Sequence, residues 1–174
     1  MEISTQNYTT LDIPQSPGVY ILHLELPRTQ FLQIGKLGKF QFSTGQYLYV
    51  GSALNRGGLK ARLGRHLLGS QNRHWHIDWL RPFTSVKGLF YTAAGTRYEC
   101  LWSQFLIQML GGHIPVPGFG ASDCRNRPAR CAAHLVFFMR GLDGNMLRNK
   151  LPNYHGSPVV YLELPIHFHQ IGVT

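Results

Sequence analysis

Residues Tyr47 to His66 read YLYVGSALNRGGLKARLGRH, and this stretch contains the clearest strand, turn and helix patterns of the chain. Its first four residues are aromatic, apolar or β-branched, which is typical of a strand. Gly51 ends the strand without a side chain that would block a ligand, and the asparagine and glycines that follow provide turn chemistry. From Leu59 the apolar residues recur at helical spacing with basic residues between them. The stretch therefore predicts a strand, a tight turn and a basic helix over 58–68.

The same patterns extend outward from this stretch. Further strands are predicted at 18–26, 31–35, 85–92, 134–139 and 159–164, and further helices at 74–80 and 97–110. We expect the first two strands, over 18–35, to form a hairpin. The order predicts a mixed α/β (α+β) domain with a small, largely antiparallel sheet flanked by helices.

Length and hydropathy limit the organisation of the chain. Its 174 residues fit one domain, which we place at 17–140, with a flexible leader at 1–16 and a C-terminal extension at 141–174 that packs on the domain. No apolar run approaches the ~20 residues of a membrane span, and the first residues lack a signal-peptide layout. We therefore expect a cytoplasmic protein without membrane contact.

Positive charge is concentrated in the middle of the chain. The sequence has 17 Lys and Arg against 8 Asp and Glu, a net charge of +9. Between Leu26 and Ser122 the only acids are Asp78 and Glu99. A basic field attracts polyanions, so we expect a nucleic-acid partner, most simply DNA. A basic protein without any nucleic-acid role is the alternative.

Two tyrosine tripeptides carry a resemblance to a known family. Gly18-Val19-Tyr20 opens one strand and Tyr49-Val50-Gly51 closes another, with Arg62 on the next helix and Glu99 farther on. This arrangement resembles the GIY-YIG nuclease superfamily. It is most similar to an uncharacterised GIY-YIG-like domain that occurs alone or fused to endonuclease III-type glycosylases. The shared blocks span 18–138 and read GxxYVGSA, RLxRH, HWHIDWL, Glu-Cys at 99–100 and PVPGFGASDC…HL.

The resemblance implies a GIY-YIG-like fold and metal-dependent hydrolysis of DNA phosphodiester bonds, with DNA repair as the expected setting. Tyr20 and Tyr49 would flank the attacked phosphate, with Tyr20 helping to deprotonate the water. Arg62 would hold the phosphate and offset charge in the transition state. Glu99 would ligate one divalent cation, Mg²⁺ or Mn²⁺.

Chemistry supports the same residue types independently. Phosphoryl transfer depends mainly on positioning and charge stabilisation, and a hard cation prefers carboxylate oxygen. A tyrosine has an ordinary pKa of ~10 and needs nearby positive charge to act as a base. His66 is a further catalytic candidate, and the alternative is a structural cation at a helix end. The remaining candidates for nucleic-acid contact are Gly51, Ser52, Lys60, Arg65, His74 and His76.

Each candidate also has a purely structural interpretation. The tyrosines could be ordinary strand residues, Glu99 could be the capping-box partner of Thr96, and Arg62 could lie on a solvated helix face. His74 and Asp78 are spaced to meet on one helical face. Alternatively, the tryptophans of the HWHIDWL block are core residues and its histidines form structural hydrogen bonds.

Two departures from the superfamily pattern keep a second function in view. The segment 21–46 separates the two tripeptides, and Ser52 stands where a basic residue usually follows the second one. The alternative to a nuclease is a non-catalytic nucleic-acid-binding module with the same fold. The third reading is a structural domain that binds a protein partner of unknown identity.

The three cysteines are too few, and odd in number, for a disulfide framework. Cys100 falls in a helical apolar pattern and is predicted to be a core residue. Cys124, Cys131 and His134 have the spacing C-x6-C-x2-H within or beside a long loop at 113–133. Zinc would need a fourth ligand, for which His113 and Asp123 are the near candidates. We favour a loop packed by small residues and cysteines over a metal site.

Overall fold

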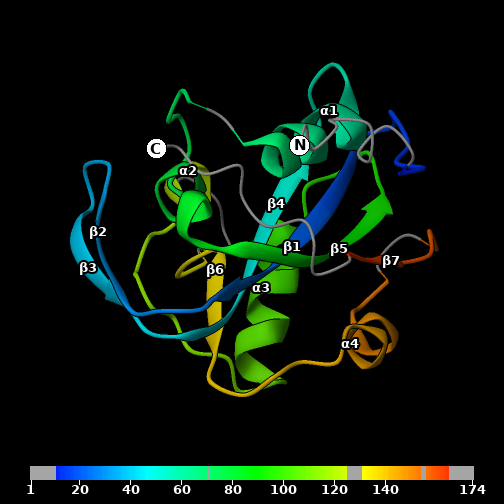
Figure 1. Cartoon of the computed structure of the whole chain (residues 1–174). Coiled ribbons are helices and arrows are strands. Elements are labelled where there is room, and N and C mark those ends of the chain that lie inside the picture. The colour runs from blue at the N-terminus through cyan, green and yellow to red at the C-terminus, as the bar shows by residue number, and fades with distance from the viewer. Residues whose placement is uncertain (1–10, 70, 125–130, 154–155, 165–174) are drawn as a thin grey trace, which may run out of the picture.

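The computed structural model describes residues 11–69, 71–124, 131–153 and 156–164. A five-stranded antiparallel sheet with the order β6-β4-β1-β5-β7 crosses the molecule, as Figure 1 shows. Its strands are β1 (Gly18–Leu26), β4 (Gly45–Ala53), β5 (Ser85–Ala93), β6 (Leu135–Phe138) and β7 (Val160–Glu163). The central strand β1 is almost wholly buried, because it is paired on both edges and covered on both faces.

Helices cover both faces of this sheet. One core contains alternate residues of β1, with α1 (Gly58–Leu68) and α2 (Ile77–Leu80) packed on them. The other core contains the intervening residues of β1, covered by α3 (Glu99–Gln108) and α4 (Gly144–Lys150). Two short 3-10 turns are also present: η2 (Arg81–Phe83) directly follows α2, and η3 (Ser122–Cys124) lies between α3 and β6. The predicted mixed α+β class is confirmed.

The predicted hairpin over 18–35 is wrong. Strand β2 (Gln30–Ile34) pairs with β3 (Gly38–Phe42) in a separate two-stranded sheet. Both edges of β1 are already occupied, by β4 and β5, so the next strand along the chain must find another partner. The segment that separates the two tyrosine tripeptides is thus an inserted hairpin. The tripeptides themselves lie on neighbouring strands, with Tyr20 opposite Gly51.

The described part of the predicted leader packs on the domain. Ile13 is buried in the core beneath α1. The carbonyl oxygens of Pro14 and Ser16 accept hydrogen bonds from the backbone amides of Lys60 and Leu59, at 3.0 Å each. Residues 11–16 therefore cap the N-terminus of α1, whereas residues 1–10 of the predicted leader lie outside the described ranges.

Helix boundaries shift in two places and one helix was not predicted. Helix α3 begins at Glu99, with Tyr98 at the N-cap position, so Glu99 is the first helical residue and not the third. Regular helix in the HWHIDWL block begins only at Ile77. Helix α4 begins after Asp143, whose carboxylate accepts the backbone amide of Met146 at 2.7 Å. Beyond it, β7 pairs with β5 along the sheet edge.

Across the described ranges, no helix combines the length and apolar character that a membrane span requires.

Candidate functional site

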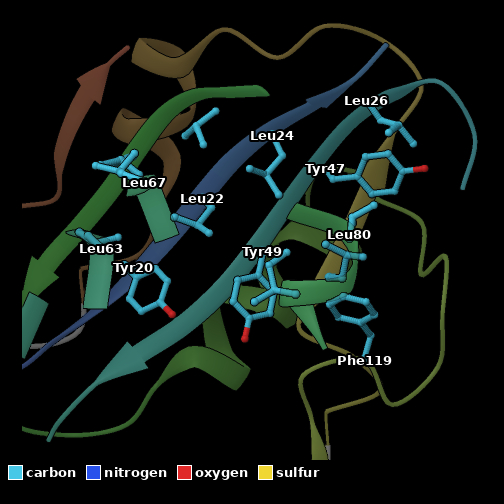
Figure 2. Close-up of a cluster of buried hydrophobic side chains, with 14 of the residues drawn as sticks. Tyr20, Leu22, Leu24, Leu26, Tyr47, Tyr49, Leu63, Leu67, Leu80 and Phe119 are labelled. Carbon is cyan, nitrogen blue, oxygen red and sulfur yellow. The ribbon is translucent and has the colours of Figure 1, made fainter. Parts of the chain in front are cut away.

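Tyr20 and Tyr49 lie on the same face of the sheet, on the neighbouring strands β1 and β4. Figure 2 shows both rings among buried leucines of β1, α1 and α2. The centroids of the two rings are 6.5 Å apart. The ring of Tyr20 lies over Gly51, where an added Cβ would stand 2.4 Å from the tyrosine Cζ. Any side chain at Gly51 would displace Tyr20, which explains why the second tripeptide ends in glycine.

His66 is the hydrogen-bond partner of Tyr20. Its Nε2 lies 2.8 Å from the tyrosine hydroxyl oxygen, and both groups are buried. The imidazole reaches this place from the inner face of α1, whose apolar residues hold the helix on the sheet. Burial lowers the pKa of His66 to about 3, so the ring is neutral. A neutral imidazole can accept the hydroxyl proton of Tyr20 at this nitrogen.

Trp75 covers the outer side of His66. The two ring centroids lie 6.2 Å apart. The guanidinium carbons of Arg62 and Arg65 each lie 4.0 Å from the centroid of the Trp75 ring. Both arginines come from α1, whereas Trp75 lies just before α2. This cation–π stacking joins the two helices over the tyrosines.

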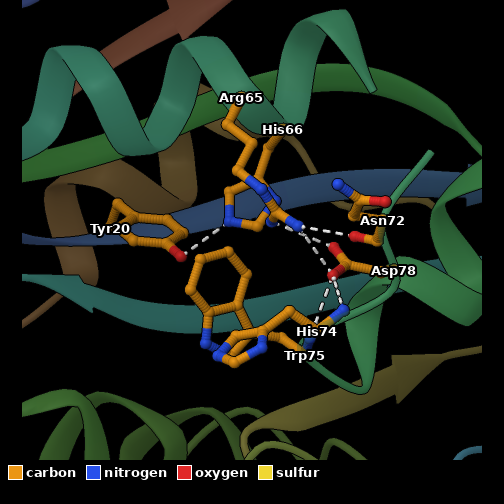
Figure 3. A network of polar contacts seen from close by, with 7 residues as sticks. All are labelled: Tyr20, Arg65, His66, Asn72, His74, Trp75 and Asp78. Carbon is orange, nitrogen blue, oxygen red and sulfur yellow. Dashed lines mark hydrogen bonds and ion pairs between the residues drawn. The ribbon is translucent and has the colours of Figure 1, made fainter. Parts of the chain in front are cut away.

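Asp78 holds the turn that presents Trp75, as Figure 3 shows. Its carboxylate forms a two-pronged ion pair with Arg65, at 2.9 and 3.2 Å, and Oδ2 also accepts the backbone amides of His74 and Trp75. Burial raises the pKa of Asp78, but the hydrogen bonds from Arg65 and the two amides outweigh burial and lower it. The carboxylate is therefore ionised and fully engaged.

The surroundings of the tyrosines oppose ionisation in the described arrangement. Burial raises the pKa of Tyr20 well above its ordinary value; Tyr49 raises it further, and the charges of Arg62 and Arg65 partly oppose the increase. Burial likewise raises the pKa of Tyr49. Neither hydroxyl is a resident base. The positive charges of Arg62 and Arg65 lower the pKa of both tyrosines, as a catalytic base would need, but burial raises it by more.

Glu99 is placed near these groups from the opposite face of the sheet. It is the first residue of α3 and only 4% exposed, and its oxygen Oε2 is buried. The negative charge of Glu99 is one of the influences that raise the pKa of Tyr49, after burial, so the two groups are within electrostatic range.

The remaining predicted contacts lie around this centre. Lys60 is exposed on α1, and Ser52 is half-buried on β4 beside Gly51. His74 is exposed, and its backbone amide, not its ring, reaches Asp78. The predicted meeting of the His74 and Asp78 side chains on one helical face does not occur, because regular helix starts at Ile77, so that Asp78 is helical and His74 is not.

His76 ties the loop at 113–133 to this region. Its Nδ1 accepts the backbone amide of Gly120 at 3.0 Å, and burial lowers its pKa. The ring of Phe119 packs on both His76 and Tyr49, at 5.6 and 6.2 Å between centroids. The loop therefore forms one wall of the tyrosine site. In the sequence, the apolar residues of this Pro- and Gly-rich segment are the feature that indicates a loop packed on the domain.

The N-terminus of α1 is not available to an anion in this arrangement. A helix N-terminus binds anions through free backbone amides. The amides of Leu59 and Lys60 instead donate to the carbonyls of Ser16 and Pro14. These two amides are therefore already engaged.

Cys100 is the residue whose place beside the other cysteines the sequence did not indicate. Its Sγ lies within 4.8 Å of the ligand atoms of Cys124, Cys131 and His134, and all four residues are buried. The fourth donor is thus a residue assigned only to the core, at the start of α3. His113 is exposed and lies outside this group, and the side chain of Asp123 is outside the described atoms. The predicted packing of this loop by cysteines and a small residue occurs, with Cys100 and Ala121 in the same cluster.

Fold and site together define a small α+β domain whose sheet carries a tyrosine–histidine pair beneath a basic helix. The chain belongs to the family described as "Domain of unknown function DUF123", whose model matches residues 19–151. The match runs from the first tyrosine tripeptide to the end of α4. No curated protein and no solved structure matches the chain.

Proposed function

We propose that this protein is a GIY-YIG-type, divalent-metal-dependent nuclease that hydrolyses DNA phosphodiester bonds. The observation that carries the proposal is the Tyr20–His66 hydrogen bond, with Tyr49 on the same sheet face and Arg62 above it. These are the residue types that the superfamily resemblance requires, and they come from the expected strands and helix. The net charge of +9 supports a polyanionic substrate.

Each residue has a defined part in this proposal. Arg62 contacts a nonbridging phosphate oxygen, and Lys60 contacts a neighbouring phosphate. Tyr20 orients the attacking water and passes its hydroxyl proton to His66 as it takes one from the water. A phosphate nearby raises the low pKa of His66, because negative charge favours the imidazolium. Glu99 would hold Mg²⁺, which would supply charge stabilisation at the phosphate.

Substrate entry in this proposal requires Trp75 to move. The indole lies between the guanidinium groups of Arg62 and Arg65 and covers His66. A phosphate competes with the indole for the same cations, and its charge–charge attraction is stronger than cation–π stacking. Arg65 remains paired with Asp78, so Arg62 is the cation available to the phosphate.

Burial of the centre favours a second candidate, a non-catalytic nucleic-acid-binding module. Tyr20 is 2% exposed and Glu99 is 4% exposed. A carboxylate that receives a metal from solvent is usually more open than this. In the second candidate, DNA contacts only the exposed basic side chains such as Lys60, and the buried centre stabilises the fold.

The test is cleavage of labelled DNA structures, namely single strands, duplexes, flaps and junctions, with Mg²⁺ or Mn²⁺. We expect cleavage by the wild type and a loss of at least ~100-fold in Glu99→Gln, because the metal ligand is removed. Glu163→Gln, an exposed carboxylate on β7, is the matched control and should retain activity. Equal activity of Glu99→Gln and the wild type would refute the metal assignment.

Binding separates the two candidates when no substrate is cut. The second candidate predicts affinity that falls steeply with salt and is weakened by Lys60→Gln, with no effect of Glu99→Gln. Absence of both cleavage and salt-dependent binding would exclude both candidates.

A further inference from the structure

Three cysteines and one histidine from separate parts of the chain converge on one point. Cys100 lies on α3, Cys124 ends η3, and Cys131 and His134 precede β6. The Sγ atoms of Cys100 and Cys124 lie 3.5–3.6 Å from His134 Nε2, and Cys131 Sγ lies 2.9 Å from it. All four residues are buried, and their donor atoms lie within 4.8 Å of one another.

We propose that these four residues form a structural zinc site of the Cys₃His type. With Zn–S bonds of about 2.3 Å and Zn–N bonds of about 2.0 Å, a tetrahedron has S–S edges of about 3.8 Å and S–N edges of about 3.5 Å. The distances from Cys100 and Cys124 to His134 already match the S–N edge. Thiolate and imidazole donors in a tetrahedron select zinc over Mg²⁺.

Two sulfur–sulfur distances are shorter than the edge of a zinc tetrahedron. The Sγ of Cys100 lies 2.9 Å from that of Cys131 and 3.2 Å from that of Cys124. An outward shift of Cys131 by about 1 Å, with Cys100 and Cys124 moving apart by a further ~0.6 Å, would meet the tetrahedral edges of a zinc site. A surface pocket lined by Cys124, Cys131 and Lys36 lies on that side, so the thiol has room to move and the metal has an entry path.

Backbone hydrogen bonds position the donors before any metal binds. The amide of Gly118 donates to the carbonyl of Ala132 at 2.7 Å, and the amide of His134 donates to the carbonyl of Phe119 at 2.7 Å. The amide of Val50 donates to the carbonyl of His134, which anchors that ligand to β4. A site built on a scaffold of this kind pays little ordering entropy on binding metal.

The metal would clamp the loop at 113–133 against the sheet and α3. In the described part of that loop the only helix or strand is the short turn η3, and the small apolar cluster around the thiols contains Ala121 as its other member. The clamp acts next to the proposed nuclease centre, because Glu99 precedes Cys100 and Gly120 lies between His134 and Tyr49, where an added Cβ would stand only 3.0 and 3.1 Å from their side chains. The zinc site itself does not depend on nuclease activity.

The test is the metal content of the whole chain, purified under reducing conditions without chelator and measured by elemental mass spectrometry. We expect about one zinc per chain and three thiols that react with a thiol reagent only after chelation. After replacement by Co²⁺, we expect the intense visible bands of tetrahedral cobalt and a sulfur-to-cobalt charge-transfer band.

Variants localise the site. Cys100→Ser should lose most of the metal, and His113→Asn, a histidine of the same loop outside the cluster, should keep it. Should Cys100→Ser not fold, His134→Cys keeps the proposal testable. It retains four donors, so it should bind zinc and shift the cobalt charge-transfer band.

Four results would overturn the proposal. They are a metal-free wild type with three reactive thiols, a Cys100–Cys131 disulfide under reducing conditions, iron in place of zinc, and metal loss in His113→Asn.

Discussion

Two buried polar regions lie on either side of β4, and they differ in what closes them. In the tyrosine region, Tyr20 is paired with His66, and Asp78 is paired with Arg65. That region is closed by its own hydrogen bonds and opposite charges. In the cysteine cluster, the donor atoms of three thiols and His134 lie within 4.8 Å of one another. The tyrosine region is closed by groups of the chain itself, whereas the cysteine cluster would gain from the cation that we propose for it.

The largest expected effect is removal of metal from the cysteine cluster. In small zinc-dependent domains the metal contributes ~10–16 kcal/mol of binding free energy, and here the sheet core persists, so we expect a loss of about 5 kcal/mol in stability. Thermal unfolding with and without a strong chelator measures it. Cys131→Ser should unfold early and be insensitive to chelator. Equal unfolding temperatures of the treated and untreated wild type would show that both regions close without metal.

Asp78→Asn removes the ion pair with Arg65 in the tyrosine region. We expect a loss of about 3 kcal/mol, because Arg65 and two amides lose a buried carboxylate. The matched control is Glu25→Gln in the exposed pair with Lys87, which should cost less than ~1 kcal/mol. Urea unfolding of both variants gives the comparison. A similar cost for the two would mean that Asp78 does not hold the Trp75 turn.

The same carboxylate predicts a response to acid. Since the folded pKa of Asp78 lies below its ordinary 3.8, the pair contributes fully above about pH 3.8 and is lost as the pH falls through the lower folded value. Asp78→Asn should therefore show a smaller loss of stability than the wild type in that acidic range.

Gly51→Ala tests the packing beneath Tyr20. The new Cβ would lie 2.4 Å from the ring, and overpacking of this kind costs about 2 kcal/mol. Gly64→Ala is the control, since nothing lies within 4 Å of its Cβ position in the middle of α1, where alanine should stabilise by ~0.5–1 kcal/mol. Urea midpoints that move in the same direction would contradict the close approach of Tyr20 to β4.

The last expected effect is a gradual slope in the stability between pH 6.5 and pH 3. The folded pKa of His66, about 3, lies below the 6.5 of a free histidine, so the unfolded chain binds a proton that the folded chain does not. Stability should fall as pH falls through this range, by up to ~1.4 kcal/mol per pH unit from this residue.

His66→Gln should reduce this slope, and His74→Gln, on the surface, should leave it unchanged. Burial also lowers the pKa of His23, so part of the slope should remain in His66→Gln. Urea unfolding across the pH range measures both variants. An unchanged slope in His66→Gln would show that the imidazole is not buried as a neutral group.

Local periodicity predicted the elements well where packing agreed with it. The strand and helix between Tyr47 and His66 occur as expected, with α1 at Gly58–Leu68. Strand β5 also occurs where alternation predicted it. Strand β3 and helix α4 were not predicted, because short segments carry weak periodic signals. The pairing of β2 with β3 was not predicted either, because a strand's partner depends on which sheet edges remain free.

The sequence by itself determined the residue chemistry and the local faces. Alternation within strands settles which side chains point the same way, and helical spacing settles that Arg62, Arg65 and His66 leave α1 close together. Only the tertiary structure decided that Arg65 is paired with Asp78, that Glu99 is buried, and that Cys100 joins Cys124, Cys131 and His134. Those contacts join residues far apart in the chain, so they depend on which surfaces pack and not on spacing along the chain.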